Sequence, residues 1–146
     1  MVKVAVDEEL NMGADRLWHL FIDISNYPKY VKYVRSVEIS GALSAGKEWH
    51  DLTTILWIPM RIKHKTIRMI KNKSISFEAP LPFGGKMLQS FDVCETGIGS
   101  RVWGEIHFDL GNPIANLLVG PILKARLKDM LISTLEKVRK EKTNDG

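Results

Sequence analysis

The chain has one cysteine, Cys94, among its 146 residues. A lone cysteine cannot form an internal disulfide, so a reducing interior is the expected location. No apolar run approaches the roughly 20 residues that a bilayer-spanning helix needs. The N-terminal segment reaches Asp7 and Glu8 too soon for a secretory signal peptide. We therefore expect a cytoplasmic protein.

The signatures of several enzyme classes are also missing. The four histidines are scattered without ligand spacing, so we expect no metal site. Gly97-Ile98-Gly99 falls in a predicted hairpin turn and not at the start of a helix, which excludes a dinucleotide fingerprint. There is no phosphate-binding loop and no G-x-S-x-G motif for acyl chemistry. The sequence therefore predicts no cofactor.

The net charge and the length of the chain restrict which classes of partner and how many domains we expect. The net charge is +4, and the only dense basic run, 137–142, is diluted by Glu141. A nucleic-acid-binding protein usually has a stronger basic stripe, so we expect no nucleic-acid partner. Weak, transient attraction to an anionic membrane surface is compatible with this charge. A length of 146 residues with 45% hydrophobic residues fits one domain with one core.

Hydrophobic periodicity predicts an element order of β-α-α-β6-α. A strand over 2–12 precedes a helix over 14–23 and a short second helix that begins at Tyr27-Pro28 and carries Val34. The next strand opens at Val37, and the others cover 47–57, 60–70, 74–78, 86–94 and 100–109. Pro80 and Pro82 predict a loop over 79–85, because proline is not tolerated in a central strand.

The last helix has a clear start signal. Asn112-Pro113 is a capping residue followed by proline at the first helical position. The helix is predicted to run to about Lys140 with a kink at Gly120-Pro121, and the polar tail 143–146 is expected to fray. The predicted fold class is α+β, with a curved antiparallel sheet of about seven strands wrapped around this helix and a hollow between them.

Several local patterns resemble the START/polyketide-cyclase (SRPBCC) superfamily, which has the helix-grip fold. They are ADRLWHLFID at 14–23, YPKY at 27–30, VRSVEI at 34–39 leading to Gly46, and GSRV at 99–102 before Phe108-Asp109. The resemblance covers nearly the whole chain and implies a single START-like domain over 1–142. Members include aromatic polyketide cyclases, lipid and quinone carriers, plant hormone receptors and chaperone activators, so the resemblance implies a fold more than an activity.

Three connections at one end of the predicted sheet are apolar: 57–60, 79–85 and 110–113. The first half of the last helix, 114–123, is apolar almost all round, although a helix on one core needs only one apolar stripe. These segments either pack on each other, with a dimer as one way to do so, or form a mouth that admits a ligand or touches a membrane. The resemblance favours the mouth, whose portal residues are Trp57, Pro59, Leu81, Phe83, Ile114 and Pro121. The kink would then act as a gate; otherwise it simply bends the helix around the sheet.

Strand alternation predicts which side chains line the hollow. The expected pocket residues are Ile62, His64, Thr66, Arg68, Met87, Gln89, Phe91, Ile106 and Phe108, with Leu118 from the last helix. The parity of 47–57 is ambiguous, so Trp49 and Asp51 are not assigned to either face. A mostly apolar lining with a few polar groups is typical of small-molecule pockets.

Arg68 and His64 are the candidates for chemistry. A buried Arg68 would need a partner or an acidic or carbonyl-bearing ligand. By resemblance, Arg68 stands where aromatic polyketide cyclases carry an arginine that polarises a ketide carbonyl, and Phe91 where they carry a pocket aromatic. Tyr30 and Tyr33 stand near their helix-borne tyrosine. The alternatives are an Arg68 that reaches solvent near the strand end and a His64 satisfied within the core or at its rim.

Three functions remain open at this point. The first is binding or transport of a hydrophobic small molecule such as a lipid, quinone, isoprenoid or polyketide. The second, less expected, is an aromatase/cyclase-type enzyme in which Arg68 stabilises an enolate-like oxygen and His64 or a tyrosine moves protons. The third is a protein-assembly or chaperone-activating module that uses the apolar end. Nothing in the pattern sets an oligomeric state.

Overall fold

The computed structural model describes residues 2–145, apart from the side chains of Phe83 and 141–145. One antiparallel sheet has seven strands in the order β1-β7-β6-β5-β4-β3-β2. The strands are β1 (Val2–Leu10), β2 (Val34–Glu38), β3 (Glu48–Thr53), β4 (Met60–Ile70), β5 (Ser74–Pro80), β6 (Lys86–Glu95) and β7 (Ser100–Asp109). The helices are α1 (Ala14–Ile22), α2 (Tyr27–Tyr30), α3 (Pro113–Leu118) and α4 (Gly120–Asp145), with short 3-10 turns η1 (Ile24–Asn26) and η2 (Pro82–Gly84).

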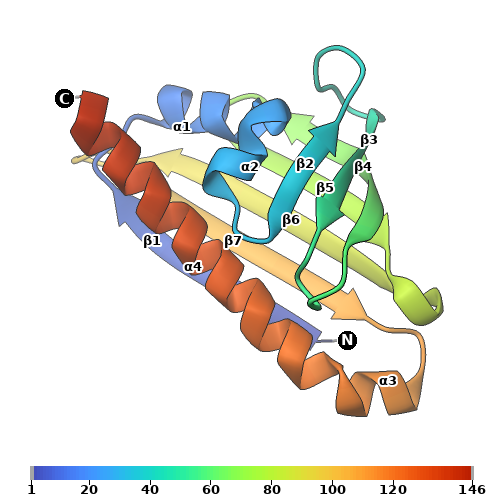
Figure 1. Ribbon diagram of the computed structural model, residues 1–146. Helices are drawn as coiled ribbons and strands as arrows, with labels where there is room; N and C mark the ends of the chain where they lie inside the picture. The colour runs from blue at the N-terminus through green and yellow to red at the C-terminus, as the bar shows by residue number, and fades with distance from the viewer. Residues whose placement is uncertain (1, 146) are drawn as a thin grey trace.

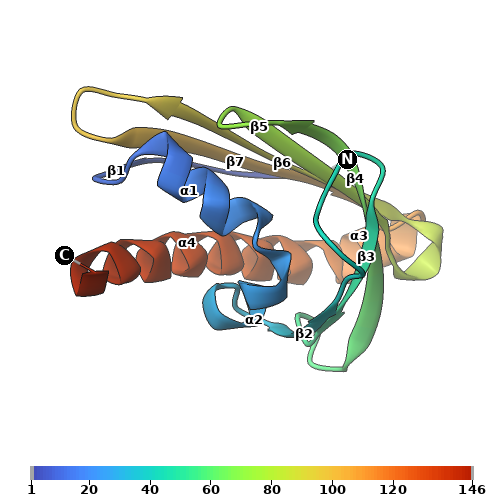
Figure 2. The ribbon, with the colours of Figure 1, turned by 90° about the horizontal axis from the view of Figure 1, so that it is seen from above.

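This architecture confirms the predicted α+β fold with a curved sheet around a long C-terminal helix (Figure 1). β1 pairs with β7 along its whole length, from Val2 opposite Phe108 to Leu10 opposite Ser100. Figure 2 shows the sheet curling from β1 to β2, with α4 lying lengthwise in the hollow and α1 and α2 beside it. The space between sheet and α4 is where a ligand site can form.

One face of α4 supplies much of the core. Its buried residues recur every three or four positions, as an amphipathic helix requires. They are Leu123, Leu127, Met130, Leu131, Leu135 and Val138. The N-terminal part of this stripe, from Leu123 to Leu131, packs with Ile106 and Phe108 of β7, which are both fully buried. Each such side chain contributes roughly 1.5–3 kcal/mol through burial, so α4 is fixed firmly against β1 and β7.

The expected kink at Gly120-Pro121 is a break between two helices. α3 ends at Leu118, Val119 lies between the helices, and α4 begins at Gly120. Proline has no N–H to donate to the preceding turn, which explains the interruption. α4 extends to Asp145, beyond the expected end near Lys140, and Gly146 lies outside the described residues. No helix in the described part of the chain combines the length and apolar character needed to cross a bilayer.

Three boundaries differ clearly from the sequence predictions. The strand expected over 47–57 is β3 and ends at Thr53, because the chain turns there and the Trp57 N–H donates to the Thr54 carbonyl. Val34 is the first residue of β2 and is buried, so it does not belong to the second helix. β5 continues to Pro80, which lies opposite Lys86, although 79–85 was expected to be a loop. The strand tolerates this proline because Pro80 is its last residue. The missing backbone N–H therefore falls where the pairing of the strand ends.

Candidate functional site

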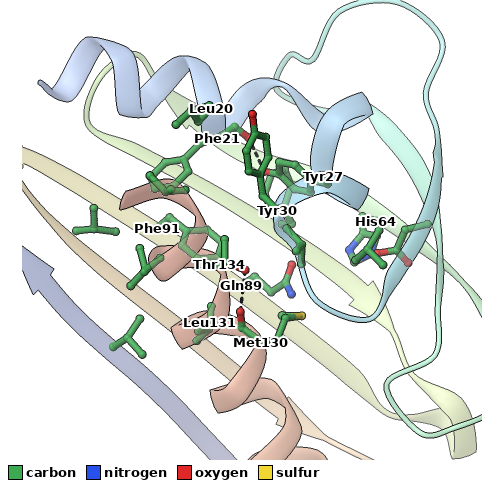
Figure 3. A pocket seen from close by; sticks show the side chains of 18 of the residues that line it. Leu20, Phe21, Tyr27, Tyr30, His64, Gln89, Phe91, Met130, Leu131 and Thr134 are labelled. Carbon is green, nitrogen blue, oxygen red and sulfur yellow. Dashed lines mark hydrogen bonds and ion pairs between the residues drawn. The ribbon is translucent and has the colours of Figure 1, made fainter. Parts of the chain in front are cut away.

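A cavity of about 90 Å³ lies between the sheet, the α1–α2 segment and α4. Its walls are mostly apolar, with Leu20 and Phe21 from α1, Val31 after α2, and Leu131 and Leu135 from α4. Figure 3 shows these elements closing around the hollow, with Gln89 and His64 as polar side chains near it. An apolar enclosure with few polar groups is the usual form of a small-molecule site.

A second lobe of about 50 Å³ continues toward the β3–β4 and β5–β6 connections. It is lined by apolar residues that include Ile55, Met60, Leu81 and Leu123. The two lobes share Val34, Asp51, His64, Gln89 and Met130 as lining residues. Three polar side chains, Asp51, His64 and Gln89, therefore lie at the junction of the lobes, and mostly apolar walls extend to either side of them. The other polar lining residues are Tyr27, Tyr30 and Thr134 in the main cavity and Thr53 in the second lobe.

Asp51 and His64 form a buried pair at this junction. His64 Nε2 and Asp51 Oδ2 are 3.1 Å apart, and the residues are 3% and 8% exposed. The β3–β4 register places Trp49 opposite His64, and the two rings stack with centroids 4.2 Å apart and planes 17° apart. This stacking fixes the imidazole plane, so the ring nitrogens have defined directions.

Several polar atoms around this pair have no hydrogen-bond partner. They are Trp49 Nε1, Asp51 Oδ1, His64 Nδ1 and Thr66 Oγ1. Leaving a buried polar atom unpaired costs roughly 1–3 kcal/mol, and native structures contain few such atoms. Among the described residues no group of His, Cys, Asp and Glu has an arrangement suited to a metal ion. Asp51 and His64 line both lobes, so their unused hydrogen-bonding capacity is available to an organic ligand, whereas Thr66 lines neither lobe.

Arg68, expected inside the hollow, is exposed on the other face of the sheet. β4 pairs Thr66 with Phe77 and then Arg68 with Ser76, so Ile67 is an extra residue that forms a bulge. The bulge reverses the alternation, since Met69 becomes half-buried while Arg68 points to solvent. The arginine that the cyclase comparison requires is therefore absent from this cavity.

The other expected pocket residues occupy three kinds of position. His64, Gln89 and Phe91 line the main cavity, and Ile62 and Met87 line the second lobe. Thr66, Ile106 and Phe108 face inward but are completely buried in the core. Leu118 lies outside the pocket and is 65% exposed, because the break at Val119 places it on the separate helix α3.

The expected portal residues lie at the end of the molecule that carries α3. Trp57, Pro59, Ile114 and Pro121 are exposed, while Leu81 is half-buried and lines the second lobe. The side chain of Phe83 is outside the described residues. We call the exposed set at this end the apolar end; it consists of Trp57, Ile58, Ile114, Leu117, Leu118 and Ile122. Exposed apolar side chains gathered at one end of a molecule usually mark an interaction site.

Arg126 supports the tip of the β3–β4 connection. Its guanidinium lies 4.0 Å from the centre of the Trp57 ring, and its Nη1 donates to the carbonyl of Ile55 at 3.0 Å. Trp57 has φ of 69°, a conformation that a bulky residue adopts only when its surroundings hold it there. Arg126 therefore stabilises an exposed tryptophan in a strained backbone.

A second clamp holds the segment between α2 and β2 onto α4. Tyr33 Oη and Lys32 Nζ donate to Asp129 Oδ2 at 2.8 Å and 2.6 Å. These hydrogen bonds hold the pKa of Asp129 below its usual value. The clamp is complete above the pKa of an unfolded aspartate and is lost as the pH falls through the lowered value. It keeps Val31 in place over the cavity.

We expect Asp129→Asn to loosen this segment without unfolding the protein. The ion pair is largely exposed, so the free energy of unfolding should change by less than about 1 kcal/mol. The Thr54 N–H donates to the Tyr33 carbonyl at 2.9 Å, and its hydrogen exchange should become several-fold faster. Asp7→Asn, which removes the negative charge from the distant ion pair with Arg101, is the matched control. Unchanged exchange at Thr54 in the Asp129 variant would contradict the clamp.

The comparisons with known proteins agree with this fold. Residues 1–141 match the family described as "Polyketide cyclase / dehydrase and lipid transport". A search of curated proteins found no match. The crystal structure of TTHA0849 from Thermus thermophilus is similar, with a TM-score of 0.79 at 17% identity over 95% of both chains.

Two further solved structures are similar at low identity. A START superfamily protein from Mycobacterium smegmatis has a TM-score of 0.73 at 15% identity over 95% of both chains. The di-domain ARO/CYC StfQ from the steffimycin biosynthetic pathway has a TM-score of 0.75 at 12% identity, over 98% of this chain and 52% of that one. These likenesses show the START/SRPBCC helix-grip fold. Because the family profile covers nearly every residue, the chain belongs to the polyketide cyclase/dehydrase and lipid transport family.

Proposed function

We propose that this protein binds a hydrophobic small molecule in its cavity and carries it. The observation that supports this function is the two-lobed cavity, whose walls are mostly apolar. The ligand classes that we propose are a lipid, a quinone, an isoprenoid or a polyketide, and lobes of about 90 and 50 Å³ hold only part of such a molecule unless their walls move apart on binding. The family includes both lipid transport and cyclase activities, so membership is compatible with a carrier.

A cyclase is the second candidate, and one observation favours it. The Asp51–His64 pair borders the cavity and is of the type that moves protons in enzymes. StfQ, one of the similar structures, is named as an aromatase/cyclase. Against this reading, Arg68 is exposed, so the cavity lacks the expected group to stabilise a developing enolate. We therefore place carriage ahead of catalysis.

Native mass spectrometry with a cavity-filling variant tests the binding function. Thr134 lines the cavity on α4, and Thr134→Phe should fill part of it. Ile132→Phe enlarges an exposed residue of the same helix and is the matched control. Wild-type protein and the control, purified gently, should retain an extractable apolar molecule near one per chain, and Thr134→Phe should lose most of it. A ligand-free mass for all three, with no thermal shift from lipids, quinones or polyketides, would reject binding.

We further propose that the ligand enters and leaves at the apolar end while this end touches an anionic membrane surface. The segments that carry it, 52–77 and 110–128, contain no Asp or Glu. Exposed Lys124 and Lys128 follow the apolar residues on α4, with Arg126 between them. Exposed apolar side chains beside cations are the usual composition of a surface that binds anionic lipids. A protein partner is the alternative occupant.

Vesicle sedimentation tests the membrane contact. Wild-type protein should sediment with vesicles that contain phosphatidylserine and much less with pure phosphatidylcholine vesicles. Leu117→Glu/Leu118→Glu should lower the partition coefficient by more than about tenfold, since each inserted leucine contributes roughly 1.5–3 kcal/mol. Ile98→Glu changes a residue that is 68% exposed in the β6–β7 turn at the opposite end and should bind normally. Equal sedimentation of all three proteins would rule out this surface and leave a protein partner.

A further inference from the structure

We infer that Asp51, His64 and Gln89 form a site for a hydroxyl group, so that the preferred ligand is an apolar phenol or alcohol. This inference rests on the proposed binding function and specifies its ligand. The three side chains come from β3, β4 and β6 and line both lobes of the cavity. A ligand that places a hydroxyl group at the junction would keep its apolar parts against the apolar walls on either side.

The hydrogen bond between Asp51 and His64 determines which of their side-chain atoms remain free to bind a ligand. An ionised carboxylate only accepts, so the hydrogen of the 3.1 Å contact belongs to His64 Nε2. His64 Nδ1 has no partner; it accepts a hydrogen in the neutral ring and donates one in the charged ring. Asp51 Oδ1 is also an acceptor without a partner. A hydroxyl group can give its one hydrogen to Asp51 Oδ1 or to the neutral Nδ1, and its oxygen can accept from a charged Nδ1. A ketone or ester carbonyl has no hydrogen for Asp51 Oδ1.

Gln89 complements the pair. Its side chain reaches into the cavity from β6, and in Figure 3 its amide end is directed toward the side where His64 lies. Its amide nitrogen makes a weak contact of 4.0 Å with Met87 Sδ, which a better acceptor can replace. The amide can therefore donate to the hydroxyl oxygen while the hydroxyl hydrogen goes to the Asp51–His64 pair. One hydroxyl group would thus use a donor and an acceptor of the site together.

The surroundings of the pair argue against a purely structural role. The neighbouring inward positions on the two strands, Trp49, Thr53, Ile62 and Thr66, carry uncharged side chains. Well-packed apolar residues are often as stabilising as a buried ion pair, or more so. The pair therefore adds little to stability that leucine or phenylalanine would not supply. Stacking against Trp49 holds the imidazole in one orientation, as a binding group requires.

A matched pair of probes tests the inference on the wild-type protein. The probes are 4-butylphenol and butylbenzene, which differ only in the hydroxyl group. By calorimetry the phenol should bind at least about tenfold more tightly, because a site with unpaired polar groups discriminates against a ligand that lacks the hydroxyl. In protein labelled with ¹⁵N-histidine, the Nδ1 resonance of His64 should shift with the phenol and stay nearly unchanged with butylbenzene.

Two variants separate the polar site from the cavity. Asp51→Leu/His64→Phe removes the polar pair, keeps an aromatic ring beside Trp49 and should reduce the preference for the phenol to about twofold or less. Thr66→Val removes a buried hydroxyl of a residue that lines neither lobe and should keep the full preference. If the double variant does not fold, Gln89→Leu provides the test, and its preference should fall several-fold.

The outcomes distinguish this inference from the binding function. Equal affinity of wild-type protein for the two probes, or a preference that persists in the double variant, would overturn the hydroxyl site and leave binding intact. Failure to bind either probe in wild-type protein, together with a ligand-free native mass, would overturn both. A histidine shift that is the same with both probes would also contradict a contact between the hydroxyl group and Nδ1.

Discussion

Gly85→Ala is expected to destabilise the protein by roughly 3 kcal/mol or more. A Cβ at this position would lie 2.0 Å from the Asp109 carbonyl oxygen and 2.6 Å from two backbone atoms of Leu110. The φ and ψ of Gly85 are −82° and −175°, which alanine adopts without strain, so the effect is steric. Backbone atoms cannot move aside as a flexible side chain would, and the β5–β6 connection must therefore separate from the end of β7.

Gly97→Ala is the matched control, because a Cβ there meets nothing within 4 Å. Its free energy of unfolding in urea should stay within about 0.5 kcal/mol of wild type. Since Leu81 and Pro82 of this connection border the second cavity lobe, Gly85→Ala should also weaken ligand binding more than Gly97→Ala does. A Gly85 variant as stable as the control would show that the two connections are not in close contact in solution.

The fold could be predicted because its main signals are local. The Asn112-Pro113 start of the last helix is one example, since Asn112 Oδ1 accepts from the Ile114 and Ala115 N–H groups at 2.8 Å and 3.2 Å. The break at Gly120-Pro121 is another example, because proline has no backbone N–H to donate to the preceding turn, whatever the helix packs against. Strand alternation likewise assigned His64, Gln89 and Phe91 to the hollow, where they line the cavity.

Arg68 shows where local reasoning fails. Alternation along β4 holds as far as Thr66, and the bulge at Ile67 then inverts it. The bulge arises from the pairing of β4 with β5, so it depends on two strands and leaves no mark within 60–70 alone. Leu118 fails for a related reason: helical spacing places it on the core face only if the helix continues through Val119, and it does not.

Trp49 and Asp51 were missed because the segment 47–57 gave no clear parity. β3 has buried Trp49, Asp51 and Thr53 alternating with more exposed residues, so its inward face carries polar groups. A rule that assigns apolar residues to the core cannot orient such a strand. The one usable signal was His64, since a histidine predicted to face inward needs a partner, and the neighbouring strand offers Asp51.

Breaking the Asp51–His64 pair should be far more damaging than removing it completely. His64→Phe leaves the Asp51 carboxylate 8% exposed in an apolar surrounding with its partner gone. Removing one member of a buried pair usually costs about 3–5 kcal/mol, whereas replacing both by apolar residues is often neutral or stabilising. Asp51→Leu/His64→Phe should therefore be within about 1 kcal/mol of wild type, or more stable.

Urea denaturation of the two single variants and the double variant measures this coupling as a double-mutant cycle. Thr66→Val, which removes a neighbouring unpaired hydroxyl, is the control and should be neutral or slightly stabilising. A His64→Phe variant within about 1 kcal/mol of wild type would mean that Asp51 has another source of solvation. The double variant is expected to be as stable as wild type and yet unable to discriminate 4-butylphenol from butylbenzene. That combination would separate ligand binding from stability at this site. The pair would then be retained for what it binds, since the fold itself would be equally stable without it.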